Sequence, residues 1–89
     1  KYLSLKVITD TGYFTLINRT HIFNSFKGQQ VSLFLIDLTI KIKTNNLKYI
    51  INNNRLKNHF QGTLNESLEK TFSIRVSHGS ILVYQKFNK

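Results

Sequence analysis

The 89-residue sequence contains no cysteine, methionine, proline or tryptophan, and it has only four acidic residues. Without cysteine there is no disulfide scaffold and no thiolate metal site, so packing and strand pairing must stabilise the fold. This composition fits a protein of a reducing intracellular compartment. No stretch approaches the roughly 18 consecutive apolar residues of a membrane span, and no signal-peptide pattern is present. These absences predict an intracellular protein, cytoplasmic or nucleoid-associated, with no membrane partner.

The scarcity of carboxylates also argues against catalysis. Two-metal phosphoryl transfer needs several carboxylates converging on ions about 3.5–4 Å apart. Here the carboxylates fall in a turn, at a strand end and in a polar stretch; they are Asp10, Asp37, Glu66 and Glu69. The histidines lack the paired spacing of zinc sites, and there is no nucleophile elbow or glycine-rich phosphate loop. The sequence therefore predicts a non-catalytic domain without metal or cofactor.

The sequence does contain enough apolar residues for one core and a large excess of positive charge. A chain of this length buries about 60–65% of the surface that its unfolded form exposes, which favours one domain. Lys1 and the lack of methionine predict that it is part of a longer polypeptide. Thirteen Lys and Arg residues give a formal net charge of +9, which attracts polyanions. DNA is the first expected partner and RNA the second, while codon bias in an AT-rich genome is the competing explanation.

The dominant period along the first half of the chain is two, which is typical of half-buried β-strands. Leu5 and Val7 are expected to face the core. Asp10 is expected to cap the turn that follows, in which Gly12 supplies a positive φ. The predicted strands cover residues 3–9, 13–17, 21–23, 30–38, 39–43 and 47–51. Short strands separated by turn signals are typical of a small barrel or sandwich.

The second half of the chain is less regular. Residues 53–70 keep neither the two-residue period of a strand nor the 3.6-residue period of a helix beyond a few residues. They are predicted to form a linker with one helical turn around residues 66–70. Residues 71–76 and 81–87 are predicted strands joined by a turn that contains Gly79, hence a C-terminal hairpin. The whole chain, residues 1–89, is expected to form a single small, mainly β domain.

The order of turns and strands resembles a known family over about residues 5–56. In "TDTGYFTLINRTHIF", Gly12 and Tyr13 stand at the end of a turn, and Arg19 and His21 lie at a basic break between two predicted strands. "KGQQVSLFL" then opens a strand, and "TIKIK" and "LKYII" follow. This pattern resembles the C-terminal domain of insertion-sequence DDE transposases and their retroviral-integrase relatives.

The resemblance implies both a fold and a function. The fold is a five-stranded SH3-like barrel at residues 3–52, here with an additional hairpin at residues 71–87. The function is DNA binding by the non-catalytic part of a recombinase whose acidic catalytic core lies upstream. The alternative is a structural or assembly module of a phage or ribosome-associated protein, whose basic charge follows either from codon bias or from contact with RNA.

Strand alternation is expected to gather positive charge on one face. In "TIKIK" the inward Ile40 and Ile42 place Lys41 and Lys43 outward, and antiparallel pairing adds Lys48 to the same patch. A phosphate backbone would explain such like charges, and a solvated edge strand kept soluble by lysine is the competing explanation. The candidate nucleic-acid-binding residues are Arg19, Lys27, Lys41, Lys43, Lys48, Arg55 and Lys57.

A second apolar face indicates assembly. In "QVSLFLI", Val31 and Leu33 lie on one face, with Phe34 and Ile36 on the other, whereas a barrel interior uses one face only. The other face must therefore be covered. The C-terminal hairpin is the expected cover, and a second protomer or an upstream domain is the alternative.

Overall fold

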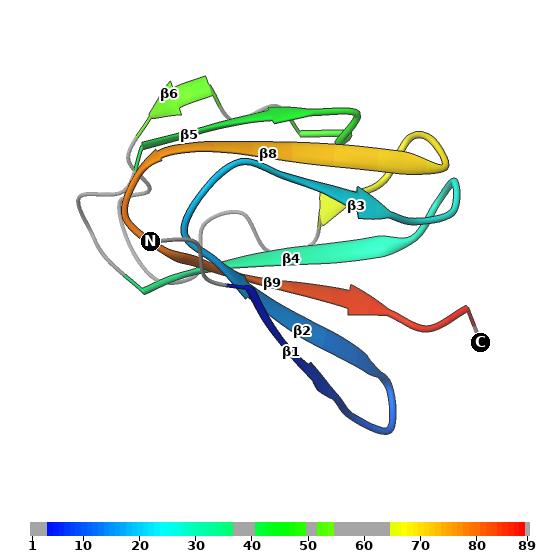
Figure 1. Ribbon diagram of the computed structural model, residues 1–89. Helices are drawn as coiled ribbons and strands as arrows, with labels where there is room; N and C mark the ends of the chain where they lie inside the picture. Colours follow the sequence, from blue (N-terminus) through cyan, green and yellow to red (C-terminus); the bar gives the residue numbers. More distant parts are fainter. Residues whose placement is uncertain (1–3, 37–40, 50–51, 55–64, 89) are drawn as a thin grey trace.

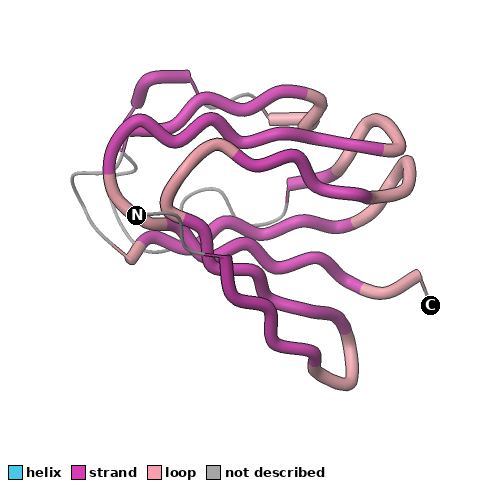
Figure 2. Tube along the Cα trace, viewed as in Figure 1, coloured by secondary structure: helices cyan, strands magenta, loops and turns pink. Residues whose placement is uncertain are grey.

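The computed structural model describes residues 4–36, 41–49, 52–54 and 65–88 (Figures 1 and 2). Its regular elements are the strands β1 (Ser4–Ile8), β2 (Gly12–Ile17), β3 (His21–Asn24), β4 (Gln30–Leu35), β5 (Lys41–Asn45), β6 (Asn52–Asn54), β7 (Asn65–Glu66), β8 (Thr71–His78) and β9 (Ile81–Lys86). The described part of the chain has no helix with the length and hydropathy needed to cross a membrane. The predicted mainly β class is confirmed.

The strands form two antiparallel sheets that pack face to face (Figure 1). Sheet A has five strands in the order β1-β2-β9-β4-β7, and sheet B has four in the order β3-β8-β5-β6. Alternate side chains of both sheets point inward and form one core, as period-two sequences require. The core residues are Ile17, Phe23, Val31, Leu33, Ile42, Leu47, Phe72, Ile74, Val76, Ile81 and Val83.

The strand partners differ from the expected barrel with an added hairpin. Only Gly79 and Ser80 separate β8 from β9, yet β8 lies in sheet B between β3 and β5, and β9 lies in sheet A between β2 and β4. A separate hairpin would leave each of these strands with an open edge. By crossing between the sheets, each gains a hydrogen-bonded neighbour on both sides, so the early strands do not close on themselves.

The segment expected to be a linker also pairs. β7 lies within it and pairs with β4, with Val31 opposite Asn65, and Leu47 forms an isolated bridge with Ser67. The helical turn expected around residues 66–70 is therefore replaced by strand pairing that starts at Asn65. β6 begins at Asn52, beyond the predicted strand at residues 47–51. Asp37 lies outside the described residues.

The turn between β1 and β2 is held by Thr9 and not by Asp10. The Thr9 hydroxyl donates to the carbonyl oxygen of Gly12 at 2.9 Å and accepts from the Gly12 amide at 3.2 Å. Gly12 is not among the positive-φ residues. A β-carbon there would meet the carbonyl oxygen of Gln85 and the Cα of Lys86. Glycine is therefore needed for the close approach of β9.

Leu5 and Val7 do not face the core; their side chains are 56% and 53% exposed. Figure 1 shows the β1–β2 hairpin projecting beyond sheet B, which therefore covers neither face of β1. These residues belong to an apolar outer face of sheet A, together with Phe14, Leu16, Phe34, Leu82 and Tyr84. The expected hairpin cannot cover this face, because β9 is part of it.

Candidate functional site

An exposed tyrosine is held in place by a buried asparagine where the chain leaves β5. Asn65 is 2% exposed, and its Oδ1 accepts hydrogen bonds from the backbone amides of Tyr49 and Glu66, each at 2.9 Å. Its Nδ2 donates to the Tyr49 carbonyl oxygen at 2.9 Å. One side chain thus satisfies both backbone groups of Tyr49, as a neighbouring strand would. The Tyr49 ring is 57% exposed on this fixed backbone.

Backbone hydrogen bonds hold the residues on either side of Tyr49 and Asn65. The Lys48 amide donates to the Glu66 carbonyl oxygen, and the Leu68 amide donates to the Asn46 carbonyl oxygen, each at 2.8 Å. Asn46 has a φ of 68°, in the left-handed region that asparagine tolerates better than most residues. Leu47 anchors the segment in the core. We call Lys48, Tyr49, Asn65 and Glu66 the Tyr49 site.

The Tyr49 site combines an aromatic face with a carboxylate. The exposed ring offers a stacking surface, and Glu66 follows Asn65 in the chain and is half-buried. Lys48 Nζ lies 5.5 Å from the Tyr49 ring centroid, near the outer limit of a cation–π contact. An aromatic ring face favours cations, and Glu66 brings a carboxylate on the residue whose backbone pairs with Lys48, so this site suits a planar, positively charged ligand.

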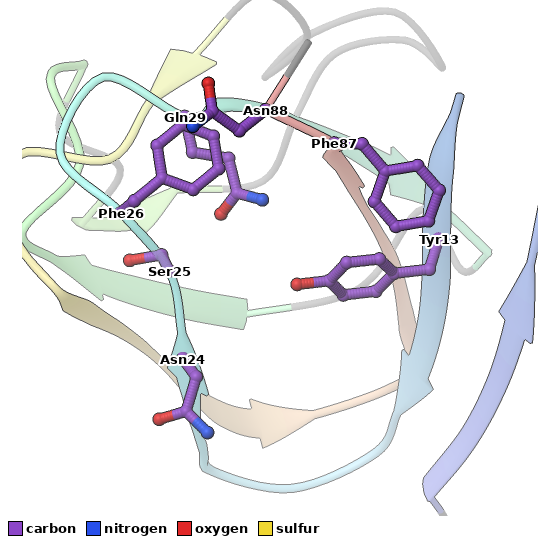
Figure 3. Close-up of a pocket in the computed structure, with 7 residues that line it drawn as sticks. All are labelled: Tyr13, Asn24, Ser25, Phe26, Gln29, Phe87 and Asn88. Atoms are coloured by element: carbon purple, nitrogen blue, oxygen red, sulfur yellow. The ribbon is translucent and has the colours of Figure 1, made fainter. Parts of the chain in front are cut away.

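A shallow pocket lies at the end of the sandwich where β9 finishes. Its volume is about 260 Å³, and it is lined by Tyr13, Asn24, Ser25, Phe26, Gln29, Phe87 and Asn88 (Figure 3). The Tyr13 and Phe87 ring centroids are 5.8 Å apart. Gln29 is 3% exposed; it donates to the Lys86 carbonyl oxygen at 2.9 Å and accepts from Gln85 Nε2 at 3.0 Å. We call this the end pocket.

The predicted lysine patch is only partly assembled. Lys41 and Lys43 are exposed on the outer face of sheet B, as the alternation of β5 predicts. Lys48 lies beyond the end of β5, at the Tyr49 site. Arg75 of β8, which the sequence analysis did not single out, lies directly opposite Lys43. Its outward position in the alternation of "TFSIRV" is the signal that could have identified it.

The other predicted basic residues are dispersed. Arg19 is exposed in the turn between β2 and β3, and Lys27 is exposed in the turn that precedes β4. Arg55 and Lys57 lie outside the described residues. Within the described ranges, no group of three or more His, Cys, Asp or Glu side chains could hold a metal ion.

Comparisons with known proteins give a consistent result. A family model described as thiamin pyrophosphokinase, substrate-binding domain, matches residues 12–84. Thiamine pyrophosphokinase from Bacillus subtilis has a similar structure, with a TM-score of 0.80 and 12% identity over 98% of this chain and 42% of that protein. The enzyme from Candida albicans has a TM-score of 0.78 and 15% identity, over 96% of this chain and 33% of that one.

A third similar structure is thiamin pyrophosphokinase from Geobacillus thermodenitrificans, with a TM-score of 0.75 and 16% identity over 94% of this chain and 41% of that one. The chain therefore spans less than half the length of each of these proteins. The comparison with curated proteins finds no match.

These findings overturn the predicted resemblance to transposases and integrases. The matching family and the similar structures are thiamin pyrophosphokinases, so the prediction of DNA or RNA as a partner is wrong, and so is the phage or ribosome-associated alternative. The resemblance depended on turn positions and alternation, which many small β folds share. Net charge reports attraction to polyanions in general and does not identify a fold or a ligand.

Proposed function

We propose that this chain, which belongs to the family of thiamin pyrophosphokinase substrate-binding domains, binds thiamin as part of a larger thiamin pyrophosphokinase. The family match over residues 12–84 carries the proposal. In this role the domain contacts the substrate and leaves the transfer chemistry to another part of the protein, in line with its few carboxylates. The intracellular location expected from the sequence belongs to the same proposal.

The Tyr49 site is the part of the domain that best fits this ligand. Thiamin joins a positively charged thiazolium ring to an aminopyrimidine ring. An exposed tyrosine ring attracts such a cation through its π face, and the carboxylate of Glu66 adds a favourable charge. Because Asn65 fixes the Tyr49 backbone, little conformational entropy is lost at this residue when the ligand binds.

The end pocket is the competing location, and two observations disfavour it. The family match ends at residue 84, so Phe87 and Asn88 lie beyond it, whereas Tyr49, Asn65 and Glu66 lie within it. In addition, Lys6 Nζ lies 4.3 Å from the centroid of the Tyr13 ring. This ammonium is closer to its ring than Lys48 Nζ is to the Tyr49 ring, at 5.5 Å, so it repels a second positive charge more strongly.

Replacing Tyr49 with alanine is expected to weaken thiamin binding about tenfold, because a desolvated cation–π contact contributes on the order of 1–2 kcal/mol. Tyr49→Phe should bind almost as well as the original chain, since it keeps the ring face. Titration with thiamin, followed by the backbone amide NMR signals of Tyr49, Asn65 and Glu66, measures both affinities and locates the site.

Phe87→Ala is the matched control, because it removes an exposed ring from the end pocket. Its thiamin affinity should equal that of the original chain. The location at Tyr49 would be refuted if Phe87→Ala weakened binding while Tyr49→Ala did not. The absence of saturable thiamin binding by the original chain would contradict the proposed function itself.

A further inference from the structure

The outer face of sheet B carries two positive charges directly opposite each other. In β5 the buried Ile42 and Thr44 alternate with exposed residues, and this places Lys43 outward. In β8 the buried Ile74 and Val76 place Arg75 outward in the same way. The register of the two strands pairs Lys43 with Arg75. Side chains so paired have Cβ atoms about 4.5–5.5 Å apart, so both cations reach the same volume of solvent.

Lys41 adds a third positive charge to this face. It is exposed, and it precedes the bulge between Lys41 and Ile42 that shifts the register against β8. Ser77 donates from its hydroxyl to the Lys41 carbonyl oxygen at 3.3 Å, which ties the two strands together at this end. We call Lys41, Lys43 and Arg75 the sheet B cations.

Sheet stability does not explain this arrangement. Like charges directly opposite each other on an antiparallel pair are destabilising, whereas opposite charges stabilise it. The carboxylates that the structure describes are Asp10, Glu66 and Glu69, and none of them lies on β5 or β8. A bound anion between the two strands would convert the repulsion into two charge-assisted contacts.

The neighbouring residues favour an oxyanion. Asn45 lies opposite Ser73 in the adjacent row of the same two strands, so hydroxyl and amide donors flank the cations. Arginine presents a planar fork that matches two phosphate oxygens, and lysine adds a point charge. A single phosphate group fits between Lys43 and Arg75. Contact with Lys41 as well requires a second anionic group next to the first, because residues two apart on a strand are about 6.6 Å apart.

We propose that the sheet B cations bind the diphosphate group of a small molecule. The inference goes beyond thiamin binding and uses none of the residues of the Tyr49 site. The ligand class follows from the spacing of the three cations on one exposed face. Lys43 and Arg75 together contact one phosphate group, Lys41 contacts a second group next to it, and neutral donors flank both.

Inorganic pyrophosphate is the probe that tests this proposal. In isothermal titrations at constant ionic strength, pyrophosphate should bind the chain with saturation, and more tightly than orthophosphate or sulfate does. Arg75→Gln and Lys43→Gln should each weaken pyrophosphate binding about tenfold, since each removes a hydrogen bond from a charged donor. Thiamin binding should stay unchanged in both variants, which separates this site from the Tyr49 site.

Lys27→Gln is the matched control, because it removes the same charge from an exposed turn that is part of neither β5 nor β8. Its pyrophosphate affinity should equal that of the original chain. Arg75→Gln should also raise the midpoint of thermal unfolding in the absence of anions, since it relieves the repulsion from Lys43. The proposal is overturned if sulfate binds as tightly as pyrophosphate, if Lys27→Gln weakens binding as much as Arg75→Gln, or if pyrophosphate does not bind.

Discussion

Replacing Phe72 with alanine is expected to lower the free energy of unfolding by about 3–5 kcal/mol, which is the usual cost of removing a buried aromatic side chain. Phe72 lies on β8 in the middle of the core and is fully buried. Its ring stacks on that of Phe23, with centroids 4.8 Å apart and an angle of 9° between the planes. The two residues are directly opposite on β3 and β8, so the substitution leaves a cavity between two paired strands.

Urea unfolding followed by tyrosine fluorescence measures this loss. Phe72→Leu keeps most of the volume and should lose clearly less, so it supplies a measurable variant if Phe72→Ala does not fold. Ile22→Ala is the control, because Ile22 precedes Phe23 on β3 and is 70% exposed. Its effect should stay within about 0.5 kcal/mol. A Phe72→Ala variant no less stable than Ile22→Ala would contradict the described core.

Replacing Asn65 with alanine is expected to lower the free energy of unfolding by about 3 kcal/mol and to weaken thiamin binding by up to about tenfold, the loss expected for Tyr49→Ala. The substitution removes three hydrogen bonds, each of which contributes on the order of 1 kcal/mol. Both backbone groups of Tyr49 lose their partner, so the ring is no longer fixed for the ligand. Chemical denaturation gives the stability, and amide hydrogen exchange at Tyr49 reports the local loss of protection.

Two other asparagine variants complete this experiment. Asn65→Asp keeps the oxygen that accepts from Tyr49 and Glu66 but loses the Nδ2 donor, so its stability should fall between those of the original chain and Asn65→Ala. Asn45→Ala removes an exposed asparagine from β5 and should change neither stability nor thiamin binding. Unchanged hydrogen exchange at Tyr49 in Asn65→Ala would show that Asn65 does not hold this segment.

The sequence identifies strands well but not their partners. The alternation in "TFSIRV" predicts the inward Phe72, Ile74 and Val76 of β8 correctly, because burial of one face is a local pattern. The two residues between β8 and β9 are typical of a hairpin, and nothing in them reveals that the strands lie in different sheets. That outcome depends on which distant strands supply an apolar surface, and a local window does not contain this information.

The Tyr49 site was missed for a related reason. Strand alternation over "LKYII" puts Tyr49 on the same face as Leu47, opposite Lys48, whereas β5 ends before this segment and the Tyr49 ring is exposed. Asn65 stands in an asparagine-rich stretch, so its role has no signal in composition. It becomes visible only when the fold brings residues 49 and 65 together. Lys41 and Lys43, by contrast, were placed correctly on an outer face, because their position follows from alternation alone.

The position of β8 and β9 in the middles of their sheets also determines when the domain can form. Until residues 71–86 have been synthesised, β2 lacks its link to β4, and β3 lacks its link to β5. The strands that are synthesised first therefore keep unpaired edges and exposed apolar side chains until the last two strands have been synthesised. Closing such distant pairs is slow, because the entropy of a long loop is lost before any contact compensates for it. During this interval, association between nascent chains competes with folding, so the rate of the last step governs the yield of native protein.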